Sequence, residues 1–209
     1  MRAGRYVTIV GPDGVGKTTF RLALLEQLEP VVEVRSDRRG GPLVEMRKRA
    51  GDRPVDASSG SSMGRLLSTA KLLYLFADQW LRWARELRRW RAGGGWIVVE
   101  RGWWDLAVFP ARYRMAPPGR LHRWLGRITP RPDLIIVLEA DAATVVARKD
   151  ELPATEVARQ SQRWHEVLPE WQPRVYLDAS LRVDRLVAEA LAALGGAVPP
   201  AEPTGQPDA

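Results

Sequence analysis

Residues 11–19 read Gly-Pro-Asp-Gly-Val-Gly-Lys-Thr-Thr, a stretch that fits the phosphate-binding pattern G-x-x-x-x-G-K-[ST]. A short apolar segment, Tyr6 to Val10, precedes it, and apolar residues at helical spacing from Phe20 to Leu28 follow it. We therefore predict a strand, a glycine-rich loop and a helix in that order, the context that the pattern requires. The alternative, a chance glycine-rich turn, does not account for the flanking strand and helix.

The residue types of this loop suit a nucleoside triphosphate. Glycines let backbone N–H groups turn toward the phosphates, and the helix N-terminus adds its positive dipole end. Lys17 reaches the β- and γ-phosphates, and the hydroxyl of Thr18 can ligate Mg²⁺. We predict ATP and Mg²⁺ as cofactors. The predicted nucleotide-binding residues of the loop are Gly11, Asp13, Gly14, Val15, Gly16, Lys17, Thr18 and Thr19.

The chain has 209 residues, a length that suits one α/β domain with its own core. It contains no cysteine, which excludes disulfides and thiolate zinc sites, and its two histidines, His122 and His165, are too scattered for a metal cluster. There is no apolar signal segment at the start and no run of about 18 apolar residues. We expect a cytoplasmic protein without a membrane segment.

The net charge of +7 and the nine tryptophans invite a nucleic-acid interpretation, because bases can stack on aromatic rings between basic residues. A site that handles two polyphosphorylated anions also needs basic groups. Four of the tryptophans fall at positions suited to packing, namely Trp80, Trp83 and Trp90 on a long helix and Trp96 at the start of a strand. We therefore expect a small-molecule partner and no nucleic acid.

A second informative segment, residues 96–101, is an apolar strand that ends in Glu100 and Arg101. Ligands of doubly wound sheets lie beyond the carboxyl ends of the strands, so both side chains should face the same crevice as Lys17. A carboxylate there can hold hydrated Mg²⁺ or accept a proton, and an arginine can clamp a phosphoryl group. The alternative is a structural ion pair. Because the chain contains no asparagine, it lacks the Asn-Lys-x-Asp element that reads guanine, which argues against a small GTPase.

Over about residues 5–194 the chain resembles thymidylate kinases and related nucleoside monophosphate kinases, as a divergent branch. The similar segments are the loop at 11–19, Arg35 at the end of an apolar segment, Glu100-Arg101, the Pro-Asp-Leu strand at 132–138, and the strand and turn at 175–180. The resemblance implies an α/β P-loop kinase, a three-layer sandwich with a five-stranded parallel sheet in the order 2-3-1-4-5 and a helical lid. It implies a kinase domain at 1–194 with the lid at about 148–165, and we expect residues 195–209 to be a disordered proline-rich tail.

The resemblance also implies roles for individual residues. Thr18 and Glu100 would hold Mg²⁺, Asp178 would lie near the nucleotide base, and Arg148 would also bind the nucleotide. The implied catalytic residues are Asp13, Lys17, Glu100, Arg101 and Arg148, and the implied acceptor residues are Arg35, Phe76, Gln79, Arg101, Trp104 and Asp105. In the lid, Arg148, Lys149, Arg159 and Arg163 are candidates for the charge on the transferring phosphoryl group, with a solvated charged face as the alternative for each. We expect loss of Arg148 to lower kcat about 10²-fold or more.

The departures from the family pattern fall on the acceptor side. Gln79 stands where an arginine is expected on the long helix, and glutamine cannot supply that charge. Gly102 replaces an aromatic residue, and Asp105 stands near a serine position, while Trp104 or its neighbour Trp103 could stack on an acceptor ring. The predicted function is an ATP- and Mg²⁺-dependent phosphotransferase acting on dTMP or a related phosphorylated acceptor. The alternatives are an alcohol or sugar kinase of specialised metabolism and a non-catalytic ATP-binding switch.

The helix predicted at 63–91 carries an apolar stripe at alternating three- and four-residue spacing. The stripe consists of Met63, Leu66, Ala70, Leu73, Ala77, Trp80, Ala84 and Leu87. It would either pack inside one chain or form a homodimer contact, which the resemblance implies for this helix. The connection before it, residues 36–62, is expected to be a loop that orders when substrate binds.

Overall fold

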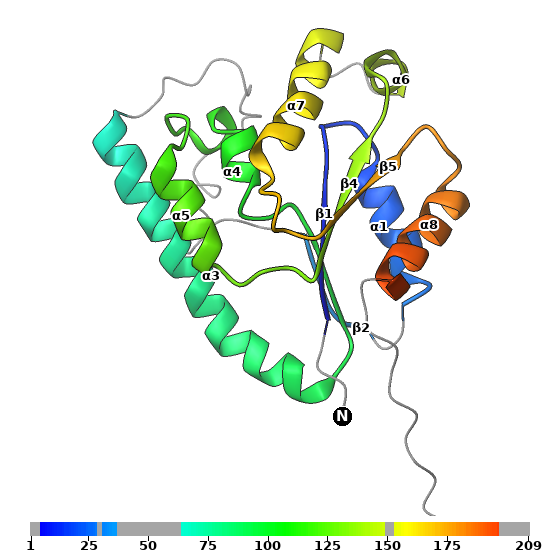
Figure 1. Cartoon of the computed structure of the whole chain (residues 1–209), viewed down its shortest axis with the longest axis horizontal. Coiled ribbons are helices and arrows are strands. Elements are labelled where there is room, and N and C mark those ends of the chain that lie inside the picture. Colours follow the sequence, from blue (N-terminus) through cyan, green and yellow to red (C-terminus); the bar gives the residue numbers. More distant parts are fainter. Residues whose placement is uncertain (1–4, 29–30, 37–63, 149–152, 197–209) are drawn as a thin grey trace, which may run out of the picture.

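A single parallel sheet organises the chain (Figure 1). The computed structural model describes residues 5–28, 31–36, 64–148 and 153–196. The five strands are ordered β2-β3-β1-β4-β5, which confirms the predicted number and order. They are β1 (Arg5–Val10), β2 (Val31–Ser36), β3 (Trp96–Glu100), β4 (Leu134–Glu139) and β5 (Arg174–Asp178).

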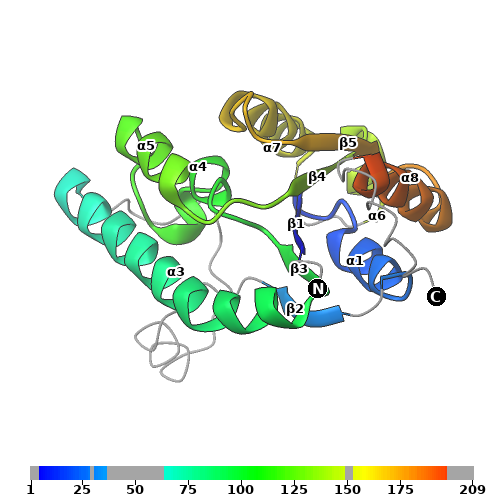
Figure 2. The same ribbon diagram turned by 60° about the horizontal axis from the view of Figure 1, so that its bottom comes forward.

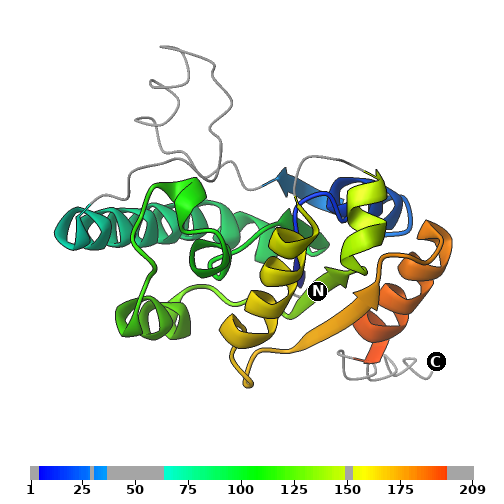
Figure 3. The same cartoon turned by 90° about the horizontal axis from the view of Figure 1, so that it is seen from above.

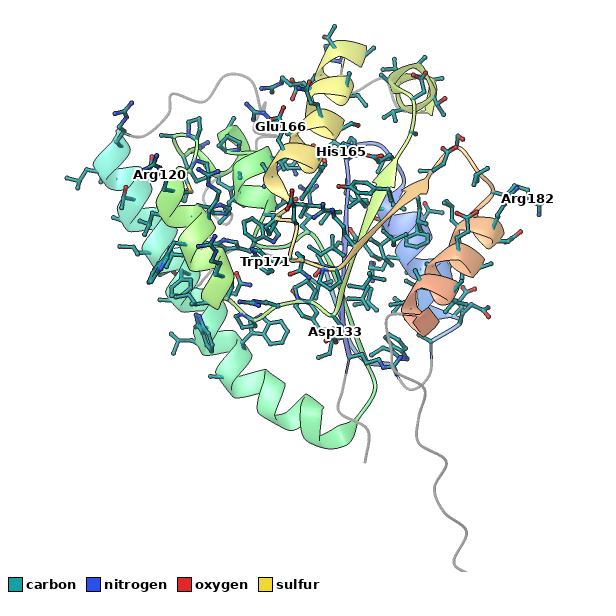
Figure 4. The ribbon with its side chains drawn as sticks, in the orientation of Figure 1. Arg120, Asp133, His165, Glu166, Trp171 and Arg182 are labelled. Carbon is teal, nitrogen blue, oxygen red and sulfur yellow. The ribbon has the colours of Figure 1, made fainter. Side chains whose placement is uncertain are left out.

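The central strands have the composition of a sheet covered on both faces. From Ile135 to Leu138, every residue of β4 is almost fully buried, as are Val7 and Ile9 of β1, which is the pattern of parallel strands with helices on either side. The Pro-Asp-Leu segment, whose Asp133 is labelled in Figure 4, ties β1 to β4. Tyr6 N–H donates to Asp133 Oδ2 and Asp133 N–H donates back to Tyr6 O, both at 2.7 Å.

Helices cover both faces of the sheet, and Figure 2 shows α3, α4 and α5 on one side and α1 and α8 on the other. Seen from above, α7 runs between α4 and α6 (Figure 3). Among the described residues, no helix combines the length and apolarity needed to cross a bilayer. The helices are α1 (Lys17–Leu25), α3 (Arg65–Gly93), α4 (Asp105–Val108), the 3-10 turn η1 (Ala111–Tyr113), α5 (Arg120–Ile128), α6 (Ala142–Arg148), α7 (Ala154–Val167) and α8 (Val183–Gly196).

The core beneath α3, α4, α5 and α7 is rich in tryptophan. The rings of Trp103 and His122 stack at 4.9 Å, and Trp103 Nε1 donates to the carbonyl of His122 at 3.0 Å. Trp104 meets His122 and Trp171 edge to face. Helix α5 can lie this close only because residue 126 is glycine: a Cβ there would stand 2.5 Å from Trp104 Cη2.

The apolar stripe of α3 faces outward. Leu66 is 84% exposed, Leu73 46% and Trp80 42%, whereas Leu72 and Leu75 point into the core. The interpretation of the stripe as an internal core face is therefore wrong for these three residues. Met63 lies outside the described residues, as does most of the loop predicted at 36–62 and the tail beyond Gly196.

Candidate functional site

The glycine-rich loop joins β1 to α1 through backbone angles that favour glycine. Gly11, Gly14 and Gly16 have φ values of 147°, 81° and 99°. At Gly11 a Cβ would stand 2.4 Å from the carbonyl oxygen of Leu138, so the loop runs directly against β4. Helix α1 begins at Lys17, which places its free N–H groups and positive dipole end at the loop, as in phosphate sites.

Lys17 is folded back onto this loop. Its Nζ donates to the carbonyls of Gly11 (3.0 Å) and Pro12 (2.5 Å) and lies 3.9 Å from Asp13 Oδ1. Burial lowers the pKa of Lys17 to about 8, although the charge of Asp13 opposes the shift. The ammonium group is therefore close to its titration point at mildly alkaline pH.

Glu100, the last residue of β3, sits between two groups from α1. Thr18 Oγ1 donates to Glu100 Oε2 at 3.3 Å, and Arg21 Nε donates to Oε1 at 2.5 Å. Parallel pairing of β1 with β3 sets Glu100 opposite Ile9, which brings the carboxylate to the loop. The hydroxyl and carboxylate oxygens of Thr18 and Glu100 are hard ligands of the kind that Mg²⁺ takes together with phosphate oxygens and water.

Arg101 adopts a left-handed backbone conformation, with φ of 70°, which is strained for a residue with a side chain. Its Nη2 donates to Asp13 Oδ1 at 3.1 Å and its Nη1 to Asp105 Oδ2 at 3.5 Å. Burial opposes its charge, but the carboxylates of Asp105 and Asp13 outweigh burial and raise the pKa of Arg101. Asp105 is itself buried and also accepts a hydrogen bond from Tyr113 Oη at 2.9 Å. The ion pairs with Asp13 and Asp105 hold this cation at the end of β3, next to the loop.

Two further residues reach the loop from distant parts of the chain. Arg112, in η1, forms an ion pair with Asp13 Oδ2. Gln160, a buried residue of α7, accepts the backbone N–H of Asp13 through Oε1 at 3.0 Å. Asp13 is therefore held on both its main chain and its side chain.

Solved structures match nearly the whole chain. The thymidylate kinase of Candida albicans aligns with a TM-score of 0.68 at 18% sequence identity, covering 93% of this chain and 92% of that one. The thymidylate kinase of Ehrlichia chaffeensis aligns with a TM-score of 0.61 at 14% identity, covering 92% and 99%. The chain has the fold of thymidylate kinases. No family model and no curated protein sequence matches it, so the likeness lies in structure rather than in close sequence.

Within this thymidylate kinase fold, the structure brings together five of the predicted site residues. Asp13, Lys17, Thr18, Glu100 and Arg101 meet at the carboxyl ends of β1 and β3, with Asp105 adjoining Arg101. Arg35 lies in β2 opposite Val99 and Arg148 ends α6; their side chains lie outside the described part of the structure. Asp178 ends β5, where its Oδ1 accepts the N–H of Ser180 at 2.9 Å.

The outcome is different for the residues predicted to bind the acceptor through the long helix and the tryptophan pair. Trp104 and Trp103 are buried in the core described above, where they contact His122, Trp171 and α5. These contacts weigh against stacking of either ring on a substrate, which stays a prediction. Phe76 is partly buried and meets Trp103 edge to face at 5.8 Å. Gln79 lines a small pocket that Trp103 and Trp104 also line.

Sequence reasoning missed Arg21, Arg112 and Gln160. Arg21 lies one helical turn after Lys17, so helical spacing could have placed it beside the loop. Neither Arg112 nor Gln160 belongs to a motif that carries phosphate chemistry. In the segment predicted to be the lid, Arg159 pairs with Glu156 and Arg163 donates to the carbonyl of Val108 at 3.1 Å, so both of these candidate residues already have partners within the structure.

A cavity of about 310 Å³ lies beside the loop, between α1 and the start of α8. Its lining is largely apolar, which suits a flat ring better than a charged group. The cavity is lined by Val15, Gly16, Thr19, Phe20, Leu138, Ala179, Leu181, Val183 and Leu186.

Proposed function

We propose that this chain is an ATP- and Mg²⁺-dependent phosphotransferase that moves the γ-phosphoryl group of ATP to a phosphorylated acceptor, with dTMP as the leading candidate. The observation that carries the proposal is the pairing of the carboxylates at the loop: Asp13 and Asp105 contact Arg101, and Glu100 contacts Arg21. A phosphate acceptor needs guanidinium groups and little help from a base. An alcohol acceptor would need a carboxylate free to take its proton.

The donor side is supported by the loop and the adjoining cavity. Loop N–H groups and Lys17 would hold the β- and γ-phosphates, and the apolar cavity beside Gly16 and Thr19 suits the base. Thr18 and Glu100 fit Mg²⁺, as their oxygen donors lie 3.3 Å apart at the loop. Bound there, the metal ion would neutralise charge on the phosphates during transfer.

On the acceptor side, Arg101 would bind the acceptor phosphoryl group, with Arg35 as a second cation from β2. Asp105 or Asp13 would orient acceptor hydroxyl groups. Arg148, at the end of α6, is proposed as the lid cation that meets charge spread over the transferring phosphoryl oxygens. Because Gln79 lacks the charge expected on α3, an acceptor other than dTMP remains within this proposal.

The test is ADP release from purified protein with Mg-ATP across a panel of acceptors. The panel begins with dTMP and dUMP, continues with other nucleoside monophosphates, and includes unphosphorylated nucleosides and sugar phosphates. We expect stimulation by a phosphorylated acceptor and none by its unphosphorylated counterpart. Stimulation by alcohols alone would contradict the proposal, and ATP binding without turnover on any acceptor would favour the ATP-binding switch.

We also propose that α3 pairs with α3 of a second copy. Its exposed stripe alternates large and small residues at four- and three-residue spacing, through Leu66, Ala70, Leu73, Ala77 and Trp80. This spacing is the seam of a coiled-coil contact, in which a large side chain of one helix fits the space over a small one of its partner. Monomeric proteins rarely leave such a long apolar strip in water.

A further inference from the structure

Arg112 lies at the glycine-rich loop, although the sequence alone assigned it no role in binding phosphate. Its guanidinium binds Asp13 Oδ2 while Arg101 binds Asp13 Oδ1 at 3.1 Å, so one carboxylate is shared by two arginines. Both guanidinium groups also lie over the ring of Phe109, with their Cζ atoms 4.6 Å (Arg112) and 5.9 Å (Arg101) from its centre. The two cations therefore form one cluster around Asp13 and Phe109.

The turn that carries Arg112 is fixed by contacts from three directions. Tyr113 Oη donates to Asp105 Oδ2 at 2.9 Å, and Lys71 Nζ of α3 donates to the carbonyl of Tyr113 at 2.5 Å. Met115 N–H donates back to the carbonyl of Pro110 at 3.0 Å. Phe109, beneath the two arginines, packs edge to face on Trp164 of α7. A cation held this firmly is preorganised for a ligand.

Arg112 also has unused hydrogen-bonding capacity. Among the described residues, none accepts a hydrogen bond from its buried Nη1. A buried donor without an acceptor is unfavourable, and an oxyanion bound beside it would supply the missing acceptor. Asp13 supplies only two carboxylate oxygens to Arg101, Arg112 and the nearby Lys17, whereas a phosphoryl group brings three oxygens and more charge.

We propose that Arg112 and Arg101 together form a clamp for the phosphoryl group of the acceptor, and that Asp13 occupies this clamp when no acceptor is bound. The inference rests on the proposed function, which it deepens by naming a second guanidinium for the acceptor anion. It accounts for Gln79: the position on α3 where an arginine was expected lines a small pocket whose lining does not include Asp13, Arg101 or Arg112, and the positive charge comes instead from η1.

Binding of inorganic phosphate to protein saturated with Mg-ADP tests the clamp, because the nucleotide keeps the probe out of the glycine-rich loop. Arg112→Gln is expected to weaken phosphate binding about tenfold or more, as loss of a charge-assisted contact does. Asp13→Asn is expected to strengthen it, since the competing carboxylate is gone. The control is Arg185→Gln in α8, whose ion pair with Glu189 is exposed, and it should bind phosphate as the unaltered chain does.

Should Arg112→Gln fail to fold, Arg112→Lys replaces it, because lysine keeps the charge near Asp13 but lacks the planar fork. It should still bind phosphate several-fold more weakly. Unchanged phosphate binding in the folded Arg112 variant, or no gain in Asp13→Asn, would overturn the clamp.

Kinetics with an acceptor that is turned over separate the clamp from the proposed function. Arg112→Gln should raise KM for the acceptor and leave KM for ATP near its original value. Turnover with an unchanged acceptor KM overturns the clamp and leaves the phosphotransferase standing. Phosphate binding that depends on Arg112, without turnover on any acceptor, supports the clamp and removes the proposed function.

Discussion

The backbone N–H of Asp13 donates to Gln160 Oε1 at 3.0 Å, which joins the glycine-rich loop to helix α7 across 147 residues of sequence. Gln160 is almost fully buried, and its Nε2 donates to Glu156 Oε1 at 3.0 Å. Both ends of the Gln160 amide group are therefore held by hydrogen bonds, which fix the glycine-rich loop against α7.

Replacing Gln160 with methionine keeps the volume and removes the acceptor for Asp13 N–H. We expect a loss of about 1–3 kcal/mol in the free energy of unfolding, because a buried donor is left without a partner, measured by urea denaturation. Gln162→Met is the matched control: it lies on the same helix with an exposed hydrogen bond to Glu166 and should change stability by about 0.5 kcal/mol or less. Equal effects of the two variants would contradict a specific role for Gln160.

The parts of this site that could be predicted from sequence are two short segments, each of them continuous along the chain. The glycine-rich loop and the Glu100-Arg101 pair each follow an apolar strand, and parallel strands bring such ends together at one edge. The contacts of Gln160 and Arg112 with Asp13 depend instead on how α7 and the short turn η1 pack. No local pattern encodes that packing.

The tryptophans and α3 show a second limit of prediction from sequence. An apolar stripe at helical spacing has the same sequence whether it faces a core or another chain, so periodicity alone could not place Leu73 at the surface. Likewise, Trp103-Trp104 beside a predicted site suggested stacking on a ligand. The close approach of α5 through Gly126, which buries both rings, joins segments that the sequence separates.

Because Lys17 is buried, we expect the affinity for nucleotide to depend on pH. Since the pKa of Lys17 is lowered to about 8 in the free protein by burial, its ammonium is lost as pH rises through that value, whereas bound phosphates favour the charged form. The affinity for ADP should be steady below about pH 8 and fall up to tenfold per pH unit above it. Calorimetry in two buffers of different ionisation enthalpy should show proton uptake on binding near pH 8.5.

The lowered pKa of Lys17 also makes the free energy of unfolding depend on pH, in a direction that can be worked out. The pKa of Lys17 is lower in the folded chain than the ordinary value of 10.5, so its contribution to stability is least favourable below about pH 8 and improves as pH rises toward 10.5. Lys17→Arg supplies the control for both effects, because guanidinium stays charged across this range. An ADP affinity of the unaltered chain that is flat from pH 7 to 9.5 would be incompatible with a buried, titrating Lys17.

We expect a side chain at position 126 of α5 to clash with the neighbouring tryptophans. Gly126→Ala adds a Cβ that would stand 2.5 Å from Trp104 Cη2 and 2.9 Å from Trp103 Cδ1. Overpacking of this kind costs about 1–3 kcal/mol, although alanine is the better helix former. We expect a lower unfolding midpoint and an altered near-ultraviolet circular dichroism of tryptophan. Gly195→Ala in α8 meets nothing within 4 Å and should leave both unchanged or raise stability slightly.

Glu100→Gln distinguishes a magnesium role from a base role. If Glu100 organises Mg²⁺ with Thr18, the variant should need about 10–100-fold more Mg²⁺ for half-maximal turnover, and excess Mg²⁺ should restore much of kcat. Loss of a catalytic base would not be restored by metal. Glu189→Gln on α8 serves as the control for removing an acidic side chain. Unchanged kcat and Mg²⁺ dependence on every acceptor would eliminate both roles.

The exposed stripe of α3 predicts a dimer that one charge should disrupt. Leu73 lies near the middle of the described stripe and is 46% exposed, so Leu73→Asp should place an unpaired carboxylate at the centre of the helix pair, where its burial is unfavourable. Light scattering after size exclusion should give twice the 23.4 kDa of one chain for the unaltered protein and a single-chain mass for this variant. Leu22→Asp, an equally apolar and exposed site on α1, should leave the dimer intact. A single-chain mass for the unaltered protein at micromolar concentration, or dissociation by both variants alike, would show that α3 does not form this contact.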